Sequence, residues 1–508
     1  MRIAALVVLA AIAFAGDGDA ARRKFLQTFT ERTPPEARIA AIHELAASNT
    51  AAAARTLLDA WDDLEREAAR ARRDLHKVLA RLREIEASRL KEPLFAEDPD
   101  RTRLLQQEAA LSAQLRRVEA EEAAILASIA LLRAEDAVRW LEDEGLARAT
   151  APVLLQTLAL HLSETREQGV AALLVSLESA KKPEQIVPLL NALAKRGKGV
   201  GVAGAPTVIR LLLHDDWAVR AAGAHALAAI ALPECVEPLV DAMPREKENS
   251  RGLQEFTRAL QILTGQGIGP FPDVWARWLH DNRDAVRSGR VPLGRGKPAE
   301  DARDVGRFYG IPQDALRIVY VFDISGSMQV SMTNPVWVGN DPVPPKPGEE
   351  SRINAAKKEL LRAVKALRAG ARFAVLCYSD HVYPMHDELM AADEKSAKAF
   401  ESDLADVEAS GSTNIYAAMD AALRLAGVHP DDPAKEQAAD AIFLVSDGSP
   451  TTADGKLEDP QRTLLAVRQW NALRRVVIHT IGIGKEHSAG FLRAMAQENG
   501  GRYFAVSK

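Results

Sequence analysis

The chain has few of the residues that define several protein classes. It contains only 2 cysteines in 508 residues, Cys235 and Cys377, and they lie in segments that we assign to different domains. A disulfide framework is therefore not part of this fold. Aromatic residues make up 5% of the chain, the formal net charge is only −5, and no block of Lys and Arg is interleaved with aromatics. The sequence gives no electrostatic reason to expect a nucleic-acid partner.

Long apolar runs are also scarce. The run from Ile3 to Ile12 follows a single Arg and precedes Ala13-Phe14-Ala15, which has the small-x-small form of a signal-peptidase site. It is shorter than the roughly 20 residues that cross a bilayer. We expect residues 1–15 to be a signal peptide, and the protein to be exported to the periplasm, the cell surface or the medium. A retained N-terminal anchor is the alternative.

Signatures of catalysis are missing as well. The chain has no G-x-S-x-G elbow, no G-x4-G-K-[ST] loop and no H-E-x-x-H helix. His381, His386 and Asp387 are close in sequence but lack a Cys or Glu at ligand spacing, so we expect no metal there. With 47% hydrophobic and 27% charged residues, the chain can build several large soluble cores. We expect a multidomain protein that is not an enzyme.

The first part of the chain has helical periodicity. Residues 16–54 predict N-terminal helices, and residues 55–135 predict two heptad-patterned arms separated by a proline-containing break. The seam of the first arm consists of Trp61, Leu64, Ala68, Ala71, Leu75, Val78, Leu82 and Ile85. An antiparallel coiled-coil hairpin is the simplest closure. Pairing of the arms between two chains, and hence self-association, is an alternative.

Short apolar helices recur over residues 136–288. The stretch "DDWAVRAAGAHALAAI" resembles part of a HEAT repeat, with Asp216 and Arg220 at the positions that tie neighbouring repeats together in that family. The resemblance implies a stacked α-solenoid, a scaffold that binds protein and performs no chemistry. A generic helical bundle is the alternative. Residues 289–316, which are rich in Gly, Pro and charge, predict a linker.

The last 200 residues have a different pattern. Strand-like apolar runs alternate with amphipathic helices, which predicts a doubly wound, Rossmann-like α/β domain over residues 317–508. Ligands of such sheets lie beyond the carboxyl ends of the strands. Asp323, Ser325 and Ser327 stand at one such end, Thr413 precedes a helix, and Asp447 ends another strand.

This order of residues resembles the metal-ion-dependent adhesion site of von Willebrand factor type A domains, over roughly residues 305–508. The resemblance implies that Asp323, Ser325, Ser327, Thr413 and Asp447 form a site for Mg²⁺, with Mn²⁺ or Ca²⁺ as substitutes. Neutral hydroxyls can bind a hard cation without quenching its charge. The aspartates would balance the ion through water, or one would bind it directly. An acidic side chain of a protein partner would complete the shell.

Two departures from that family's pattern stand out. Residues 329–350, with Trp337 and five prolines, lie between the serines and the next helix, where they can shape partner choice or cover the site. Asp341 or a following Glu could fill the open metal position from within the chain. The other departure is Ser412, where Gly is commoner; Ser is tolerated there unless the backbone needs a positive φ.

We therefore expect an exported, non-enzymatic binding protein whose type A domain is presented on a helical scaffold. Two other functions are weighed against it. One is a metal-dependent hydrolase with Asp323 as nucleophile, although Ser325 stands where a D-x-D motif needs its second Asp. The other is an assembly protein with an inert α/β core. The site residues also have plain structural alternatives, because Ser and Thr cap helices and Asp favours turns.

Overall fold

The computed structural model describes most of the chain, namely residues 18–89, 99–165, 167–248, 250–297, 305–338, 341–432, 437–473 and 475–506. The chain divides into two compact units between Ala180 and Lys181. The expected signal peptide, residues 1–15, lies outside the described residues, and so do residues 91–98 of the break expected at residues 91–100. In the described part of the chain, no helix has the length and apolar character needed to cross a membrane.

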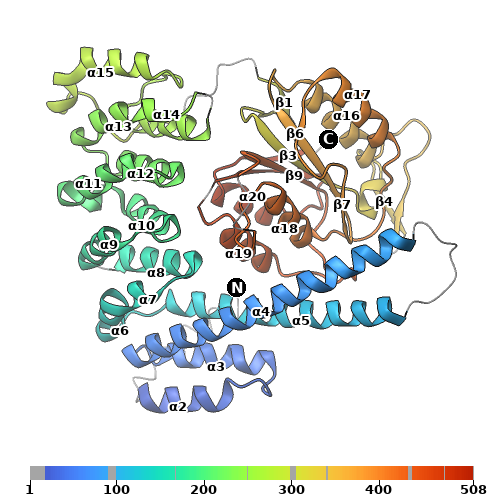
Figure 1. The fold of residues 1–508 in the computed structure, drawn as a ribbon, viewed down its shortest axis with the longest axis horizontal. Helices are drawn as coiled ribbons and strands as arrows, with labels where there is room; N and C mark the ends of the chain where they lie inside the picture. Colours follow the sequence, from blue (N-terminus) through green and yellow to red (C-terminus); the bar gives the residue numbers. More distant parts are fainter. Residues whose placement is uncertain are drawn as a thin grey trace. The chain divides into compact units, whose positions relative to one another are not determined.

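The first unit is helical. Its helices are α2 (Gly18–Thr28), α3 (Pro35–Ala47), α4 (Ala51–Arg89), α5 (Pro99–Ile129), α6 (Glu135–Trp140), a π-turn (Leu141–Gly145), α7 (Leu146–Arg148), α8 (Pro152–Thr165) and α9 (Glu167–Ser179). The two long helices, α4 and α5, lie side by side (Figure 1). The helical character predicted for this part of the chain is confirmed.

Polar contacts set the direction of the α4–α5 pair. Glu67 in the middle of α4 accepts a hydrogen bond from Gln114 Nε2 of α5 at 2.8 Å. Asn49, just before α4, accepts one from the backbone N–H of Arg133, just after α5, at 2.8 Å. The two helices are therefore antiparallel. Apolar residues of both arms are buried along their contact: Leu64, Ala68, Ala71, Val118 and Ile125. Coiled-coil supercoiling of this pair stays a prediction.

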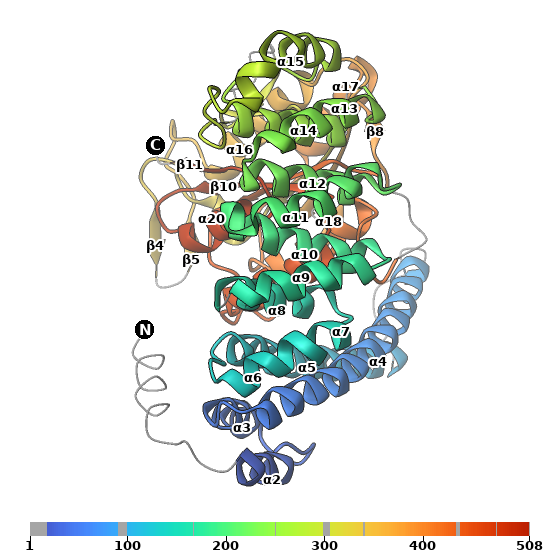
Figure 2. The same cartoon turned by 90° about the vertical axis from the view of Figure 1, so that its left-hand side faces the viewer.

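The second unit begins with shorter helices that stack one after another (Figure 2). They are α10 (Pro183–Arg196), α11 (Gly201–Arg210), α12 (Trp217–Ile230), α13 (Val236–Ala242), α14 (Arg251–Thr264) and α15 (Pro272–Arg287), joined by 3₁₀ turns at Gly197–Val200, Leu211–Leu213, Pro233–Cys235 and Met243–Arg245. Asp216 caps α12 by accepting the N–H of Ala218 at 2.8 Å. Arg220 donates through Nε to Glu246 at 2.6 Å. The HEAT resemblance of this stack stays a prediction.

An α/β sheet follows. Its elements are β1 (Arg307–Phe308), β2 (Ile311–Pro312), β3 (Arg317–Asp323), η6 (Gly326–Gln329), β4 (Val336–Val338), β5 (Asp341–Val343), α16 (Arg352–Lys365), β6 (Arg372–Tyr378), β7 (Val382–Pro384), β8 (Met390–Ala391), α17 (Glu394–Ala405), α18 (Ile415–Leu425), β9 (Ala441–Ser446), α19 (Pro460–Trp470), β10 (Val477–Ile483), α20 (Ala489–Glu498) and β11 (Tyr503–Val506). In the described residues the main sheet has the order β11-β10-β9-β3-β6-β7, with β8 also on β6. Strands β11, β10, β9, β3 and β6 are parallel, and β7 and β8 are antiparallel to β6. The predicted α/β architecture is confirmed.

Alternation along β3 explains the two layers of helices. Ile318, Tyr320 and Phe322 belong to the core that α16 and α17 cover, whereas Val319 and Val321 belong to the core under α18, α19 and α20. A strand whose two faces are both apolar must be covered on both sides, as parallel sheets are. The helices lie on opposite faces of the sheet in Figure 1.

Part of the segment expected to be a linker is folded. Within residues 289–316, β1 and β2 form a tight antiparallel hairpin. Its two turn residues, Tyr309 and Gly310, have φ of 47° and 79°, which suits a two-residue hairpin turn. Phe308 is fully buried in the core beside Tyr320. The hairpin thus contributes to the α/β core.

Candidate metal-binding site

The chain changes its winding direction between β3 and β9. From β3 the chain passes to β6 on one side, whereas β9, β10 and β11 extend the sheet on the other side. Phe322 pairs with Val445, so the ends of these two parallel strands are adjacent. A crevice beyond the carboxyl ends at such a switch point is where doubly wound sheets bind ligands. Asp323 and Asp447 lie there.

Asp323 is fully buried at the end of β3. Its Oδ1 accepts the backbone N–H of Ser325 at 2.8 Å. Its Oδ2 accepts the hydroxyls of Ser446 at 3.0 Å and Tyr378 at 3.2 Å. Burial, together with the nearby charge of Asp447, raises the pKa of Asp323 to about 7.

Asp447 follows β9 and is also buried. Its Oδ1 accepts the hydroxyl of Ser327 at 2.6 Å, and its Oδ2 accepts Nη1 of Arg352 at 2.9 Å. Burial raises the pKa of Asp447, while the Ser327 hydrogen bond and the Arg352 charge act in the opposite direction. Every oxygen of both carboxylates thus accepts a hydrogen bond from the protein, an arrangement suited to balancing an ion from outside its first coordination shell.

The hydroxyls do not serve as helix caps. Ser325 stands at the start of the 3₁₀ turn η6 without a side-chain cap hydrogen bond, and its Oγ lies 3.0 Å from Ser327 Oγ. Thr413 precedes α18, but the cap of that helix is Asn414, which accepts the N–H of Ala417 at 3.1 Å. The capping role that a Ser or Thr at these positions could have is therefore not realised.

Gly448 leaves space between two of these hydroxyls. A Cβ built on Gly448 would lie 3.4 Å from Thr413 Oγ1 and 4.0 Å from Ser327 Oγ. Both hydroxyls therefore face the same small volume, which borders Gly448, the residue after Asp447. Hydroxyl and carboxylate oxygens are the ligands and counter-charges that Mg²⁺ prefers, with several waters retained. All five residues picked from the sequence thus border one place, and their donor set fits a hard divalent cation.

Four residues of this place were missed in the sequence: Tyr378, Ser446, Arg352 and Glu486. Ser446 directly precedes Asp447, so its place in the sequence could have identified it as a site residue. Tyr378 ends β6, and its hydroxyl reaches Asp323 across the sheet. Arg352 begins α16 and contacts both Asp447 and Glu486. These contacts depend on which strands are neighbours, and no local sequence motif marks them.

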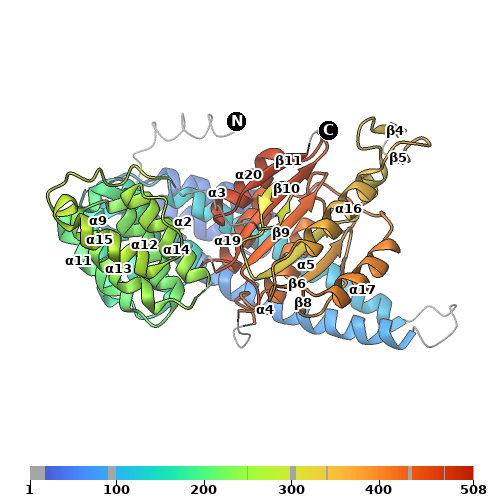
Figure 3. The ribbon, with the colours of Figure 1, turned by 90° about the horizontal axis from the view of Figure 1, so that it is seen from above.

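The insertion after the serines forms a small hairpin of β4 and β5, seen beside α16 in Figure 3. Its Pro342 Cγ lies 3.9 Å from where a Cβ of Gly326 would be, so the hairpin lies next to the serine-bearing turn. The candidate internal ligands are engaged elsewhere: Glu349 accepts from Asn334 at 3.1 Å, and Glu350 pairs with Lys358 at 2.6 Å. The side chain of Asp341 lies outside the described parts.

Ser412 is accommodated as expected. Positive φ falls on the preceding Gly411, at 81°, and not on Ser412. A Cβ on Gly411 would lie 2.8 Å from Asp380 Oδ1, so glycine is required at 411. The carbonyl of Gly411 accepts the N–H of Gly326 at 2.9 Å. This bond joins the serine-bearing turn to the Thr413 loop.

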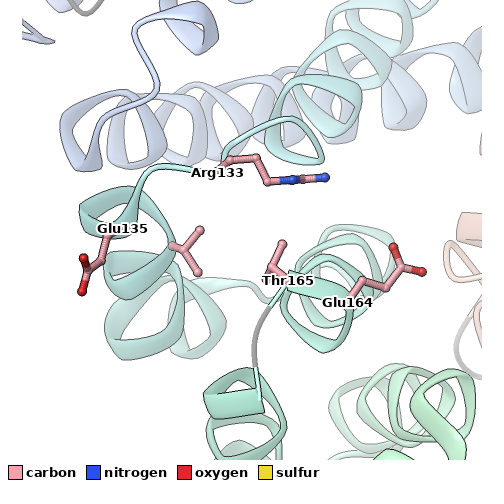
Figure 4. Close-up of a pocket in the computed structure, with 5 residues that line it drawn as sticks. Arg133, Glu135, Glu164 and Thr165 are labelled. Carbon is pink, nitrogen blue, oxygen red and sulfur yellow. The ribbon is translucent and has the colours of Figure 1, made fainter.

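A separate hollow lies in the first unit. It has a volume of about 560 Å³ and is lined by Arg133, Glu135, Val138, Glu164 and Thr165 (Figure 4). Arg133 Nη1 donates to the carbonyls of Ala130 and Leu132 and lies 3.0 Å from His161 Nδ1. The cation of this hollow is thus already engaged by its neighbours.

His386, one of the closely spaced histidines, has a structural role. His386 Nδ1 accepts the N–H of Val375 at 3.1 Å, and its ring packs against Phe373. Among the described residues, no group of three or more His, Cys, Asp and Glu could hold a metal ion.

Comparisons with known proteins bear on the second unit. Residues 347–504 match the family model of the von Willebrand factor type A domain, which identifies this segment as such a domain. No curated protein matches the chain significantly.

Solved structures that match part of this chain include the following three. A von Willebrand factor type A protein from Catenulispora acidiphila is 21% identical, with a TM-score of 0.29 and coverage of 38% of each chain. An aerotolerance-related membrane protein from Bacteroides fragilis is 16% identical, with a TM-score of 0.27 and coverage of 38% of this chain and 92% of that one. Proximal thread matrix protein 1 from the mussel byssus is 20% identical, with a TM-score of 0.26 and coverage of 38% and 41%.

Proposed function

We propose that the type A domain of this chain binds a divalent cation, Mg²⁺ first and Mn²⁺ or Ca²⁺ as substitutes, and through it an acidic group of a protein partner. Ser325, Ser327 and Thr413 would offer hydroxyl oxygens, and Asp323 and Asp447 would balance the charge through hydrogen-bonded neighbours. The cation supplies an electrophilic position that a partner carboxylate can complete. Domains of this family commonly mediate protein–protein interactions.

One observation carries this proposal. The three hydroxyls converge beside two buried carboxylates without serving as caps, although capping is the ordinary role of Ser and Thr at such positions. Two buried carboxylates, of which only Asp447 contacts a buried cation, Arg352, are costly unless a further positive charge joins them. A bound divalent cation explains both features at once.

The surroundings support a protein as the partner. The hairpin beside the site exposes Val336, Trp337 and Val338, which are 48%, 39% and 68% accessible. Exposed apolar groups gathered beside a polar site are typical of docking surfaces. We propose that the hairpin contacts the partner, and that the protein is exported and has no enzymatic activity.

Calorimetric titration of Mg²⁺, Mn²⁺ and Ca²⁺ into the metal-free full chain tests the metal site. We expect Ser325→Ala and Thr413→Ala to stay folded and to lose metal affinity by about tenfold or more, because each removes one oxygen from the shell. Thr452→Ala is the matched control, since the Thr452 hydroxyl bonds Asp454 and the Lys456 carbonyl in a neighbouring loop. A folded wild type that binds none of the three ions contradicts the proposal.

The rival functions give different results. A hydrolase would turn over model esters or phosphates with metal, and Asp323→Ala would abolish the turnover. A protein with an inert core would lose stability when the metal is removed. A chelator would then release no partner from the immobilised protein. We expect the chelator to release partners from wild type and no capture by Thr413→Ala.

A further inference from the structure

Arg352 is the most deeply buried cation of the α/β domain that contacts the site. Its side chain is only 1% exposed. Nη1 donates to Asp447 Oδ2 at 2.9 Å, and Nη2 contacts Glu486, whose side chain is 48% exposed. Nε, although buried, has no hydrogen-bond partner in the described residues. An orphaned buried N–H costs stability, so packing alone does not explain an arginine here.

The backbone provides a slot for this guanidinium. A Cβ on Gly484 would lie 2.5 Å from Arg352 Nη2 and 2.7 Å from its Cζ, and Gly484 has a φ of 75°. Any other residue at 484 would collide with the guanidinium and strain the backbone. At the other end, the N–H of Arg352 donates to the carbonyl of Val330 at 2.9 Å, which fixes the start of α16 beside the serine-bearing turn. The cation is therefore held in one place.

The charges of the site then balance in a particular way. When both carboxylates are ionised, the three buried groups Asp323, Asp447 and Arg352 carry one net negative charge. Glu486, the second partner of Arg352, is half exposed, so solvent screens its charge more strongly. A divalent cation would leave the loaded site with one positive charge, which a single partner carboxylate neutralises. With a neutral side chain at 352, the loaded site would already be neutral. Salt screens buried charges much less than exposed ones, so this difference persists at physiological ionic strength.

We propose that Arg352 is a fixed counter-charge of the metal site, which weakens its hold on a divalent cation and leaves the loaded site positively charged for an anionic ligand. This inference rests on the proposed metal site and adds a role for a residue outside the metal shell. Arg352 is a positioning and charge-setting residue, since it acts through Asp447.

The test is Mg²⁺ titration of the full chain in four variants. Arg352→Gln should bind Mg²⁺ about tenfold more tightly than wild type. Arg352→Lys, which keeps the charge, should stay within about threefold of wild type. Glu486→Gln should bind severalfold more weakly, because it removes a negative charge from the other side of the guanidinium. Lys358→Gln is the matched control: Lys358 is on the same helix but 78% exposed, so solvent screens its charge and affinity should not change.

Thermal stability gives a second measurement. Without metal, Arg352→Gln should melt below wild type, because the Asp447 carboxylate loses its buried partner. Saturating Mg²⁺ should then raise its melting temperature more than that of wild type. If Arg352→Gln fails to fold, the opposite shift in Glu486→Gln still decides, and unchanged affinity in that variant overturns the proposal.

The results separate this inference from the function on which it rests. If wild type binds Mg²⁺ and Thr413→Ala does not, but Arg352→Gln binds with unchanged or weaker affinity, the metal site stands and the counter-charge role is wrong. An equal gain in Arg352→Lys and Arg352→Gln also overturns it, since charge would not be the cause. If wild type binds no divalent ion, both proposals fall together.

Discussion

At the residue scale, individual hydrogen bonds and the absence of one side chain fix the geometry of the candidate site. Asp323 and Asp447 are held by hydroxyl, amide and guanidinium donors, which leaves them little freedom to rotate. The space beside Thr413 exists because Gly448 has no side chain. Substitutions that remove one atom or add one methyl group therefore test the geometry of this site directly.

Gly448→Ala should lower Mg²⁺ affinity by about tenfold with little change in stability. Gly448 does not have a positive φ, so alanine is not strained there, and the new methyl group would meet Thr413 Oγ1 at 3.4 Å. Calorimetry beside urea unfolding checks both parts. Gly490→Ala in α20 is the control, since its Cβ meets nothing within 4 Å. Unchanged affinity in Gly448→Ala would place the cation elsewhere.

Tyr378→Phe should destabilise the chain by about 1–2 kcal/mol, because it removes the single O–H donor that lies 3.2 Å from the buried Asp323 carboxylate and 3.0 Å from the Val445 carbonyl. Mg²⁺ affinity should also fall, as it does when groups that orient a metal site are removed. Urea unfolding measures the first effect. Tyr383→Phe, at a half-exposed phenol, should change stability by less than about 0.5 kcal/mol. Equal effects in the two variants would contradict the role given to Tyr378.

At the scale of helices and strands, the order of strands in the sheet determines which site residues could be predicted from the sequence. The five predicted site residues stand at the ends of apolar runs or at helix starts, so local pattern together with the family resemblance was enough to select them. Tyr378 and Arg352 reach the site only because β6 and α16 lie beside β3, an arrangement set by packing of the whole sheet. The β1–β2 hairpin escaped prediction since two-residue strands have no periodicity, and only the burial of Phe308 identifies it as core.

The insertion is attached to the domain by a short stretch of pairing. Ser331 pairs with Ser351, and the N–H of Met332 donates to the carbonyl of Glu350 at 2.8 Å. We expect a chain in which residues 333–349 are replaced by a short Gly-Ser linker to fold and to bind Mg²⁺ as wild type does. Partner capture should fall, because Val336, Trp337 and Val338 are lost. Loss of Mg²⁺ binding in the folded variant would show that the insertion supplies a ligand.

At the scale of the whole molecule, the second unit joins the helical stack α10–α15 to the α/β domain. The stack contacts this domain away from the candidate site. Arg258 Nη2 lies 3.5 Å from Asp314 Oδ2, and Gln254 Nε2 donates to the Asp314 carbonyl at 3.4 Å. Asp314 precedes β3, at the opposite end of that strand from Asp323. The stack therefore holds the domain at the amino end of the strand, and the candidate site lies at the carboxyl end.

The fragment Lys181–Lys508 should fold without the first unit, because the chain divides into compact units at this point. It should melt cooperatively by circular dichroism and bind Mg²⁺ with the affinity of the full chain. A fragment that is unfolded, or folded but unable to bind an ion that the full chain binds, would show that the first unit is needed for the second.

The ends of the insertion lie close together, and this affects how the length and sequence of the insertion can change in evolution. Because Ser331 and Ser351 are paired, residues can be gained or lost between them without shifting the serines on one side or Arg352 on the other. If the domain has the proposed function, mutations there can alter which surfaces it recognises while the ion chemistry is inherited intact. Selection could then act on recognition and on the proposed ion site independently.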